Sequence, residues 1–240
     1  MDQEMILEVS NLSVTLDSEN ILYDISFGVK RGEALAIIGP NGAGKTVLFR
    51  ALLGLIPYSG KVYWKEGIKI GYAPQKLTID KLMPLSVEEF FLLKSDRFWF
   101  PRNEFLDHIH HELDVVGLPV AILRKSIGEI SGGELQRILI SWAIMNHPEV
   151  LLFDEPTAGI DVGFEETIYT LLHRLQDERG TTILLISHDL EVVYRYAERV
   201  LCINKKMICH GKPREVLSPQ ELTKLYGEGG FYHHFNGMAH

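Results

Sequence analysis

The sequence predicts an α/β fold in which a parallel sheet carries helices on both faces. Short apolar segments at 150–153 and 182–186 are typical of strands buried on both sides. Each is followed by a stretch with helical periodicity, at 164–178 and 190–197, and this alternation favours a parallel sheet. The chain has 240 residues, of which 46% are hydrophobic, so it is long enough to bury one sizeable core. We therefore expect a single domain over residues 1–240.

Two regions depart from that alternation. Residues 5–29 alternate apolar and polar side chains around a turn at 17–20, which predicts antiparallel strands. Helical periodicity dominates residues 77–145, which indicates a helical subdomain inserted into a core made of 1–76 and 146–226. Residues 227–240 have no period, and we expect a mobile tail. The other predicted elements are strands at 33–38, 68–73, 200–203 and 207–210, and helices at 45–55, 87–95, 104–116 and 133–145.

Composition and charge narrow the possible functions. The chain has 24 Lys and Arg against 32 Asp and Glu, a formal net charge of −8, which weighs against a nucleic-acid partner. No apolar run approaches the roughly 20 residues of a membrane-spanning helix, and the N-terminus has no readable secretory signal. Cys202 and Cys209 are the only cysteines and lie far from any zinc-like cluster, so we expect reduced thiols packed in strands.

A phosphate-binding loop follows the first apolar strand. Gly39-Pro40-Asn41-Gly42-Ala43-Gly44-Lys45-Thr46 fits the pattern G-x-x-x-x-G-K-[ST] and lies between a predicted strand and a predicted helix. Glycines allow successive backbone N–H groups to surround an anion, and the helix presents its positive end. Lys45 is expected to reach the β- and γ-phosphates, and the Thr46 hydroxyl to bind Mg²⁺. The motif predicts a P-loop NTPase (RecA-like) core that binds ATP through residues 39–46 and the next residue, Val47.

A second group of candidate residues ends the strand at 150–153. Asp154 and Glu155 follow it directly, and the carboxyl end of a strand is where an open α/β sheet places its ligand. Asp154 can hold Mg²⁺, and Glu155 is a candidate general base for the attacking water. Alone, Asp-Glu-Pro could equally be a strand-ending turn, but beside a phosphate loop the functional interpretation is favoured.

Residues 130–137, Ile-Ser-Gly-Gly-Glu-Leu-Gln-Arg, resemble the signature loop of ATP-binding cassette (ABC) proteins. The resemblance extends over about residues 5–225 and implies a head-to-tail homodimer in which Ser131, Gly132, Gly133 and Glu134 cap ATP held by the partner copy. It implies further roles for three residues found in the family's order. Gln75 contacts Mg²⁺ and water, Asp161 in the loop 158–161 lies at the dimer interface, and His188 contacts the γ-phosphate.

The sequence departs from the family pattern at several positions. The family usually places an aromatic side chain near the end of the first strand to stack on adenine, and Leu16 occupies that position here. Base stacking is worth roughly 1–3 kcal/mol, so we expect weak discrimination between ATP and GTP. Glu134 stands where glutamine is common, and Ala158 and Ile160 where serine and leucine are common. None of these changes removes a catalytic group.

Two stretches favour one branch of the family. Residues 68–87 and 200–213 resemble the ATPase subunits of bacterial zinc, manganese and iron uptake systems, most closely the zinc-uptake ATPase. The resemblance implies a separate integral-membrane permease, an extracytoplasmic metal-binding protein and a peripheral location at the cytoplasmic face of the inner membrane. The helical subdomain is the expected docking region for the permease, and residues 98–101, Phe-Trp-Phe-Pro, are a candidate contact, although such aromatic residues more often belong to a core.

Other interpretations stay open. A soluble ABC ATPase of an assembly such as iron–sulfur cluster building, or the ATPase of a transporter for another substrate, fits the same motifs. A ribosome-acting or nucleic-acid-acting ABC protein is disfavoured by the single cassette and the acidic charge. Histidines at 233, 234 and 240, and at 108, 110 and 111, suggest a metal-sensing site, but a solvated face and tail are favoured because no carboxylate or cysteine completes a ligand set.

Overall fold

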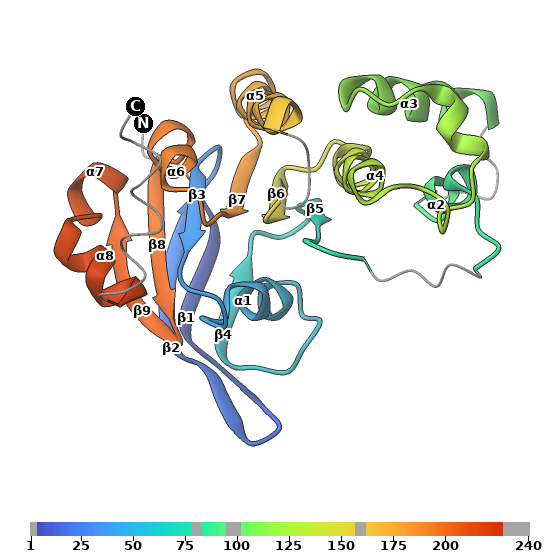
Figure 1. Cartoon of the computed structure of the whole chain (residues 1–240). Coiled ribbons are helices and arrows are strands. Elements are labelled where there is room, and N and C mark those ends of the chain that lie inside the picture. Colours follow the sequence, from blue (N-terminus) through green and yellow to red (C-terminus); the bar gives the residue numbers. More distant parts are fainter. Residues whose placement is uncertain (1–3, 78–82, 95–101, 157–161, 228–240) are drawn as a thin grey trace. The chain divides into compact units, whose positions relative to one another are not determined.

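The computed structural model describes residues 4–77, 83–94, 102–156 and 162–227 (Figure 1). They form two compact units, one of residues 1–68 and 175–240 and one of residues 69–174, which are described separately below. The predictions that concern residues 98–101, the loop 158–161 and the histidines of the tail lie outside the described residues. Within the described parts of the chain, no helix is long and apolar enough to cross a membrane.

The first unit begins with a three-stranded antiparallel sheet. Strands β1 (Met5–Leu16) and β2 (Glu19–Lys30) form the expected hairpin, and β4 (Ser59–Trp64) pairs with the other edge of β1. Alternate side chains of β1 and β2 are buried, which is the period-two pattern seen in the sequence. Strand β4 was not predicted, because four of its six residues are exposed and its sequence carries no apolar alternation.

A second sheet in this unit has a parallel centre. Strand β3 (Ala34–Ile38) lies between β7 (Thr182–Ile186) and β8 (Arg199–Asn204) and runs parallel to both, and β9 (Lys206–Gly211) returns antiparallel to β8. Every residue of β3 and β7 is buried, which accounts for their uninterrupted apolar sequences. The helices that accompany these strands are α1 (Lys45–Leu52), α6 (Leu190–Tyr196), α7 (Pro213–Val216) and α8 (Pro219–Tyr226).

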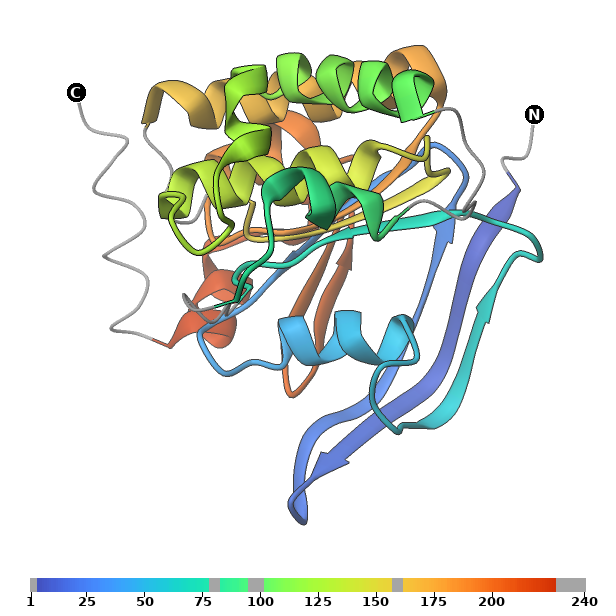
Figure 2. The same cartoon turned by 90° about the vertical axis from the view of Figure 1, so that its right-hand side faces the viewer.

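The second unit is mostly helical. Strands β5 (Ile70–Ala73) and β6 (Val150–Asp154) pair in parallel. Helices α3 (Arg102–Val115) and α4 (Gly132–Ile144) pack against each other (Figure 2). Residues 69–174 also contain α2 (Val87–Leu92), a 3₁₀ helix η1 (Val120–Arg124) and most of α5 (Val162–Arg179). The predicted helices are present, and η1 was missed because a single turn leaves too few residues to show a period. The observed α/β class with two sheets is the class that the sequence predicted.

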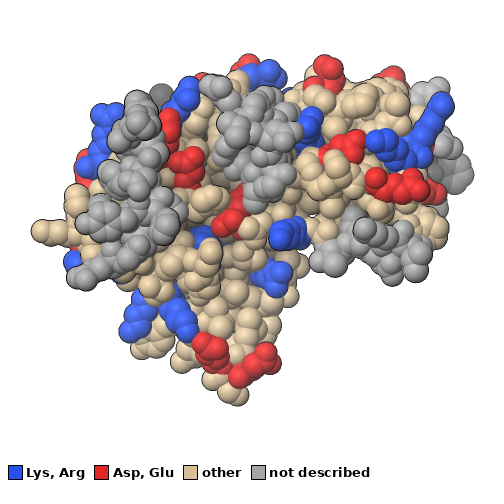
Figure 3. Space-filling model, viewed as in Figure 1, with Lys and Arg blue, Asp and Glu red and all other residues tan. Residues whose placement is uncertain are grey.

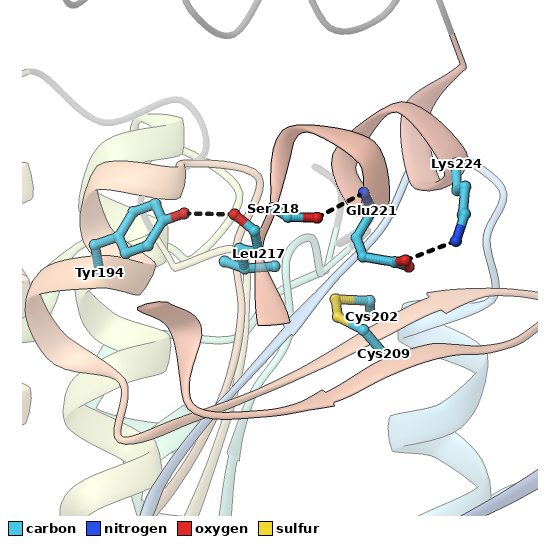
Figure 4. Close-up of a disulfide and its surroundings, with 7 residues drawn as sticks. All are labelled: Tyr194, Cys202, Cys209, Leu217, Ser218, Glu221 and Lys224. Atoms are coloured by element: carbon cyan, nitrogen blue, oxygen red, sulfur yellow. Dashed lines mark hydrogen bonds and ion pairs between the residues drawn. A yellow bond between two sulfur atoms is a disulfide. The ribbon is translucent and has the colours of Figure 1, made fainter. Parts of the chain in front are cut away.

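The two cysteines correct one expectation. They lie on strands, as expected, but the prediction of reduced thiols is wrong, because a disulfide joins Cys202 of β8 to Cys209 of β9 (Figure 4). The hairpin register places the two residues directly opposite each other, with their Cα atoms 4.9 Å apart. Leu222 and Leu225 of α8 pack in the same buried cluster as Cys202. The pairing is set by strand register, which the spacing of the cysteines along the chain did not reveal.

Candidate nucleotide-binding site

The phosphate loop begins where β3 leaves the sheet. An added Cβ at Gly39 would lie 2.0 Å from the backbone oxygen of Ile203, so the loop starts in direct contact with the end of β8. Gly44, at the end of the loop, has φ +97° and would clash with the Leu22 side chain if it carried a Cβ. By contrast, nothing lies within 4 Å of the corresponding position on Gly42. Two glycines of the motif are therefore required by close packing, and the third faces open space.

Lys45 is the first residue of α1 and lies over the loop. Its side chain is only 7% exposed, and its Nζ donates to the backbone oxygens of Gly39 at 2.7 Å and Pro40 at 3.2 Å. The first turn of α1 contains no acidic residue, so the positive end of the helix is not neutralised from within. An amine held over a glycine-rich turn at a helix N-terminus fits the phosphates of a nucleotide. Thr46 and Val47 follow in the same turn and are half-buried.

The hairpin of β8 and β9 supports the loop. The Lys205 N–H donates to the Ala43 oxygen at 3.0 Å, and the Tyr23 N–H donates to the Lys205 oxygen at 2.8 Å. Lys205 has φ +58°, the left-handed conformation of a tight turn. At the end of α8, burial raises the pKa of Tyr226 to about 12, although a hydrogen bond from the Gly39 backbone opposes that rise. These supporting residues carry no sequence signal, because they contact the loop only in the folded chain.

Leu16, at the position expected to stack on adenine, is the last residue of β1. Leu16 is half-buried there, next to the turn that leads into β2. The tip of this hairpin is acidic (Figure 3), since Asp17 and Glu19 are both exposed. Glu19 pairs with Lys205 at 2.8 Å. A leucine offers a base an apolar contact but no aromatic face, so the structure supplies no stacking surface at this position.

His188 belongs to the same unit and follows β7. It is exposed, between Ser187 and Asp189. The Ser187 hydroxyl accepts from the Asp189 N–H at 3.0 Å, and the Asp189 carboxylate caps α6 by accepting from Glu191 N–H at 2.7 Å. These two bonds hold the backbone on the C-terminal side of the histidine, so its ring is presented from a well-supported turn.

In the second unit, Asp154 and Glu155 end β6. Asp154 is 1% exposed, and its hard carboxylate oxygens are of the type that Mg²⁺ prefers. Glu155 has φ +49°, an unusual backbone conformation for this residue type. The Gln75 Nε2 donates to the Glu155 carboxylate at 2.5 Å. The structure therefore brings together two of the predicted catalytic residues that lie 80 positions apart.

The predicted signature loop caps helix α4. Ser131 is the N-cap, and its hydroxyl accepts from the Glu134 N–H at 3.2 Å, while a Glu134 oxygen accepts from the Ser131 N–H at 2.8 Å. These bonds, with an ion pair from Lys125 at 3.0 Å, lower the pKa of Glu134 to about 2. Nothing lies within 4 Å of the added Cβ positions of Gly132 and Gly133. The glycine face of the loop is therefore open.

The predicted residues thus divide between the two units. Residues 39–47, Leu16 and His188 belong to the first unit, and Gln75, Asp154, Glu155 and the signature loop to the second. Asp161 lies outside the described residues. Within each unit, the structure presents polar groups of the predicted kinds at strand ends and helix N-termini.

Comparison with known proteins gives concordant matches. The family model described as "ABC transporter" matches residues 22–158. The zinc import ATP-binding protein ZnuC of Pseudomonas syringae is 38% identical over 99% of this chain and 89% of its own length. The ZnuC protein of Yersinia enterocolitica is 37% identical over 96% and 91%.

Solved structures give the same result. An inward-facing transporter of the metal-chelate ABC type matches with a TM-score of 0.80 and 27% identity, covering 93% of this chain and 89% of its own. The dimeric ABC transporter cassette MJ0796 matches with a TM-score of 0.76 and 25% identity, covering 87% and 99%. The chain therefore belongs to the ABC transporter family, as an ATPase subunit whose hydrolysis of ATP is coupled to transport.

Proposed function

We propose that this chain powers the import of a divalent metal ion, zinc in preference to manganese or iron, through a separate membrane permease. The observation that carries the proposal is the near-full-length similarity, at 37–38% identity, to proteins named for zinc import. ATP hydrolysis requires only the motor, whereas the metal is selected by the permease and by an extracytoplasmic binding protein. The proposal therefore assigns this chain the motor role and a place at the cytoplasmic face of the membrane.

The proposed chemistry uses the residues described above. Lys45 and the loop amides bind the phosphates, and Thr46, Gln75 and Asp154 would hold Mg²⁺, which supplies charge neutralisation at the β- and γ-phosphates. Glu155 accepts a proton from the attacking water, and His188 contacts the γ-phosphate. In a head-to-tail dimer, Ser131 to Glu134 and Asp161 of each copy complete the site of the other.

The hydrogen bond between Gln75 and Glu155 suggests how hydrolysis is timed. A carboxylate that accepts from the Gln75 amide at 2.5 Å has that oxygen engaged, so the oxygen cannot take a proton from water until the bond is exchanged. Gln75 directly precedes residues 76–77 and the start of the helical subdomain. A permease contact there would act on the base through this bond.

We further propose that the permease docks on unit two, at a groove of about 640 Å³. Lys69, Lys94, His108 and His147 line it, together with the acidic Glu104 and the apolar Phe105 and Met145. This lining fits a short amphipathic cytoplasmic segment with an acidic side chain. Lys69→Glu should therefore lower metal uptake and membrane association without lowering ATP hydrolysis of the isolated subunit. Lys61→Glu, an exposed change on β4 outside the groove, is the matched control.

The function is tested in a strain that lacks this protein. Uptake of radioactive zinc, manganese and iron is measured separately, after complementation with wild type or Lys45→Ala. The expected result is restored zinc uptake with wild type and none with Lys45→Ala. Intact ATP hydrolysis without a change in the uptake of any of the three metals would reject metal import and assign the motor to another transporter or to a soluble assembly.

The role of Glu155 has its own test. Glu155→Gln should retain ATP binding and accumulate an ATP-bound dimer, because the amide cannot accept the proton from water. Hydrolysis at the wild-type rate by this variant would show that another group is the base.

A further inference from the structure

The pair formed by Lys125 and Glu134 stands beside the signature loop. Lys125 Nζ lies 3.0 Å from Glu134 Oε1, while Glu134 Oε2 accepts from the Ser131 N–H. Both carboxylate oxygens are therefore engaged, one by the helix cap and one by the lysine. The Glu134 side chain is 28% exposed and that of Lys125 is 50% exposed. The pair lies at the surface, at the end of the helix where the glycines of the loop are open.

The backbone of Lys125 is fixed by neighbouring elements. Its N–H donates to the Ile122 oxygen at 3.0 Å, and its own carbonyl accepts from the Val87 N–H at 3.0 Å. The next residue, Ser126, forms a β-bridge with Ser86, the N-cap of α2. The amine therefore reaches Glu134 from a backbone that is held in place, which reduces the entropy lost when the pair forms.

Glu134 creates an electrostatic problem for the proposed function. Its pKa of about 2 means that it carries a full negative charge at neutral pH. That charge lies in the first turn of the helix that would receive the γ-phosphate of the partner's ATP. The carboxylate of Glu134 and a phosphate bound at the same helix N-terminus would repel each other, since both are negatively charged. The carboxylate also cancels part of the positive potential of the helix N-terminus.

We propose that Lys125 is a positioning residue for ATP bound in trans, which neutralises Glu134 so that the signature loop can accept a phosphate. The inference rests on the proposed head-to-tail dimer and adds to it a residue outside the motif. Lys125 need not touch the nucleotide. It compensates locally for the glutamate that stands where the family commonly has glutamine, and it keeps the Glu134 carboxylate directed at the cap.

The test measures ATP-dependent dimerisation in a Glu155→Gln background, by sedimentation velocity in low salt. Lys125→Met keeps the aliphatic stem and removes the charge. It is compared with Lys125→Arg, with Glu134→Gln, with the double variant Lys125→Met/Glu134→Gln, and with Lys61→Met as a charge-matched control at an exposed position of unit one. Binding of a fluorescent ATP analogue to the monomer is measured for each variant, because the phosphate loop is untouched.

Without the lysine, the uncompensated charge of Glu134 should weaken the binding of the partner's phosphate by up to about fivefold per site, the upper end for one exposed charge pair. A dimer closes two sites, so Lys125→Met should weaken the dimer by up to about 25-fold. Lys125→Arg should dimerise like the parent, the double variant should recover most of the loss caused by Lys125→Met, and ATP binding to the monomer should be unchanged. The loss should shrink in 0.5 M salt, where a Debye length of about 4 Å screens the charges.

Three outcomes would overturn the inference. If Lys125→Met dimerises as tightly as the Glu155→Gln parent, the positive charge of Lys125 is not needed. Failure of Glu134→Gln to restore the Lys125→Met protein would show that the lysine acts through folding instead of charge. If no variant, the parent included, dimerises with ATP, the proposed head-to-tail function fails together with this inference, and that result is distinguishable from the first two.

Discussion

The contact between Gly39 and β8 makes the phosphate loop part of the core of its unit. An added methyl group at Gly39 would lie 2.0 Å from the Ile203 oxygen and 3.1 Å from the Ala43 side chain. Both neighbours are held, since Ile203 is a fully buried strand residue and Ala43 accepts a hydrogen bond from Lys205. Gly39→Ala should therefore force β3 and β8 apart at their ends.

The magnitude follows from the size of the overlap. Relieving it requires a backbone shift of about 1 Å in a packed sheet, which places the cost at about 3 kcal/mol, the upper end of typical overpacking penalties. Gly42→Ala is the matched control, because nothing lies within 4 Å of its added Cβ. Its positive φ of +78° costs roughly 1–2 kcal/mol. Both variants gain about 0.4–1 kcal/mol from the less flexible unfolded chain, so this gain cancels from their difference. We expect a difference of about 2 kcal/mol between the two variants.

The assay is urea unfolding of the nucleotide-free protein at 25 °C, followed by circular dichroism. Nucleotide is omitted because a bound ligand would add its own stabilisation. With an m-value of about 3 kcal/mol/M, Gly39→Ala should unfold at a urea concentration about 1 M lower than wild type, and Gly42→Ala at about 0.3 M lower. Equal midpoints for the two variants would refute the reasoning, because the steric contact would then make no difference to stability.

Two further predictions concern the base position and the pH dependence of stability. Leu16→Tyr should tighten ATP binding about fivefold or more, because an aromatic ring adds a stacking surface for the base. Isothermal titration calorimetry with ATP and GTP measures the affinities. Equal affinities of wild type and variant for ATP would contradict the prediction. Burial, together with the Arg199 guanidinium, lowers the pKa of His210 to about 4. Between pH 6.5, the ordinary pKa of histidine, and about pH 4, the unfolded chain binds more protons than the folded chain does. The free energy of unfolding should therefore fall as the pH drops through this range. The expected loss at pH 5 is about 1 kcal/mol, after allowance for the partial exposure of the ring. His210→Gln should remove this pH dependence, and an unchanged profile in the variant would assign the loss to other groups.

Much of the fold followed from local patterns. Strands β3, β6 and β7 are buried throughout. A short uninterrupted apolar segment is typical of a strand covered on both faces, so the burial of these strands could be predicted from their sequences. The phosphate loop and the hairpin of β1 and β2 depend on residues close in sequence. Short-range geometry is encoded locally, so these elements could be predicted with no knowledge of their partners.

Other features depend on residues that meet only in the folded chain. Strand β4 and helix η1 carry no readable pattern, and strand register alone brings Cys202 opposite Cys209. The hydrogen bond from Gln75 to Glu155 joins two segments that lie 80 residues apart.

The sequence by itself determined the α/β class, the phosphate loop and the membership of the ABC family, because these rest on apolar runs and on motifs of consecutive residues. Only the tertiary structure decided how the loop is supported by β8, and that Lys125 pairs with Glu134. Both depend on side chains and backbone atoms brought together by packing, and the energy of such contacts depends on distance in space, which spacing along the chain does not specify.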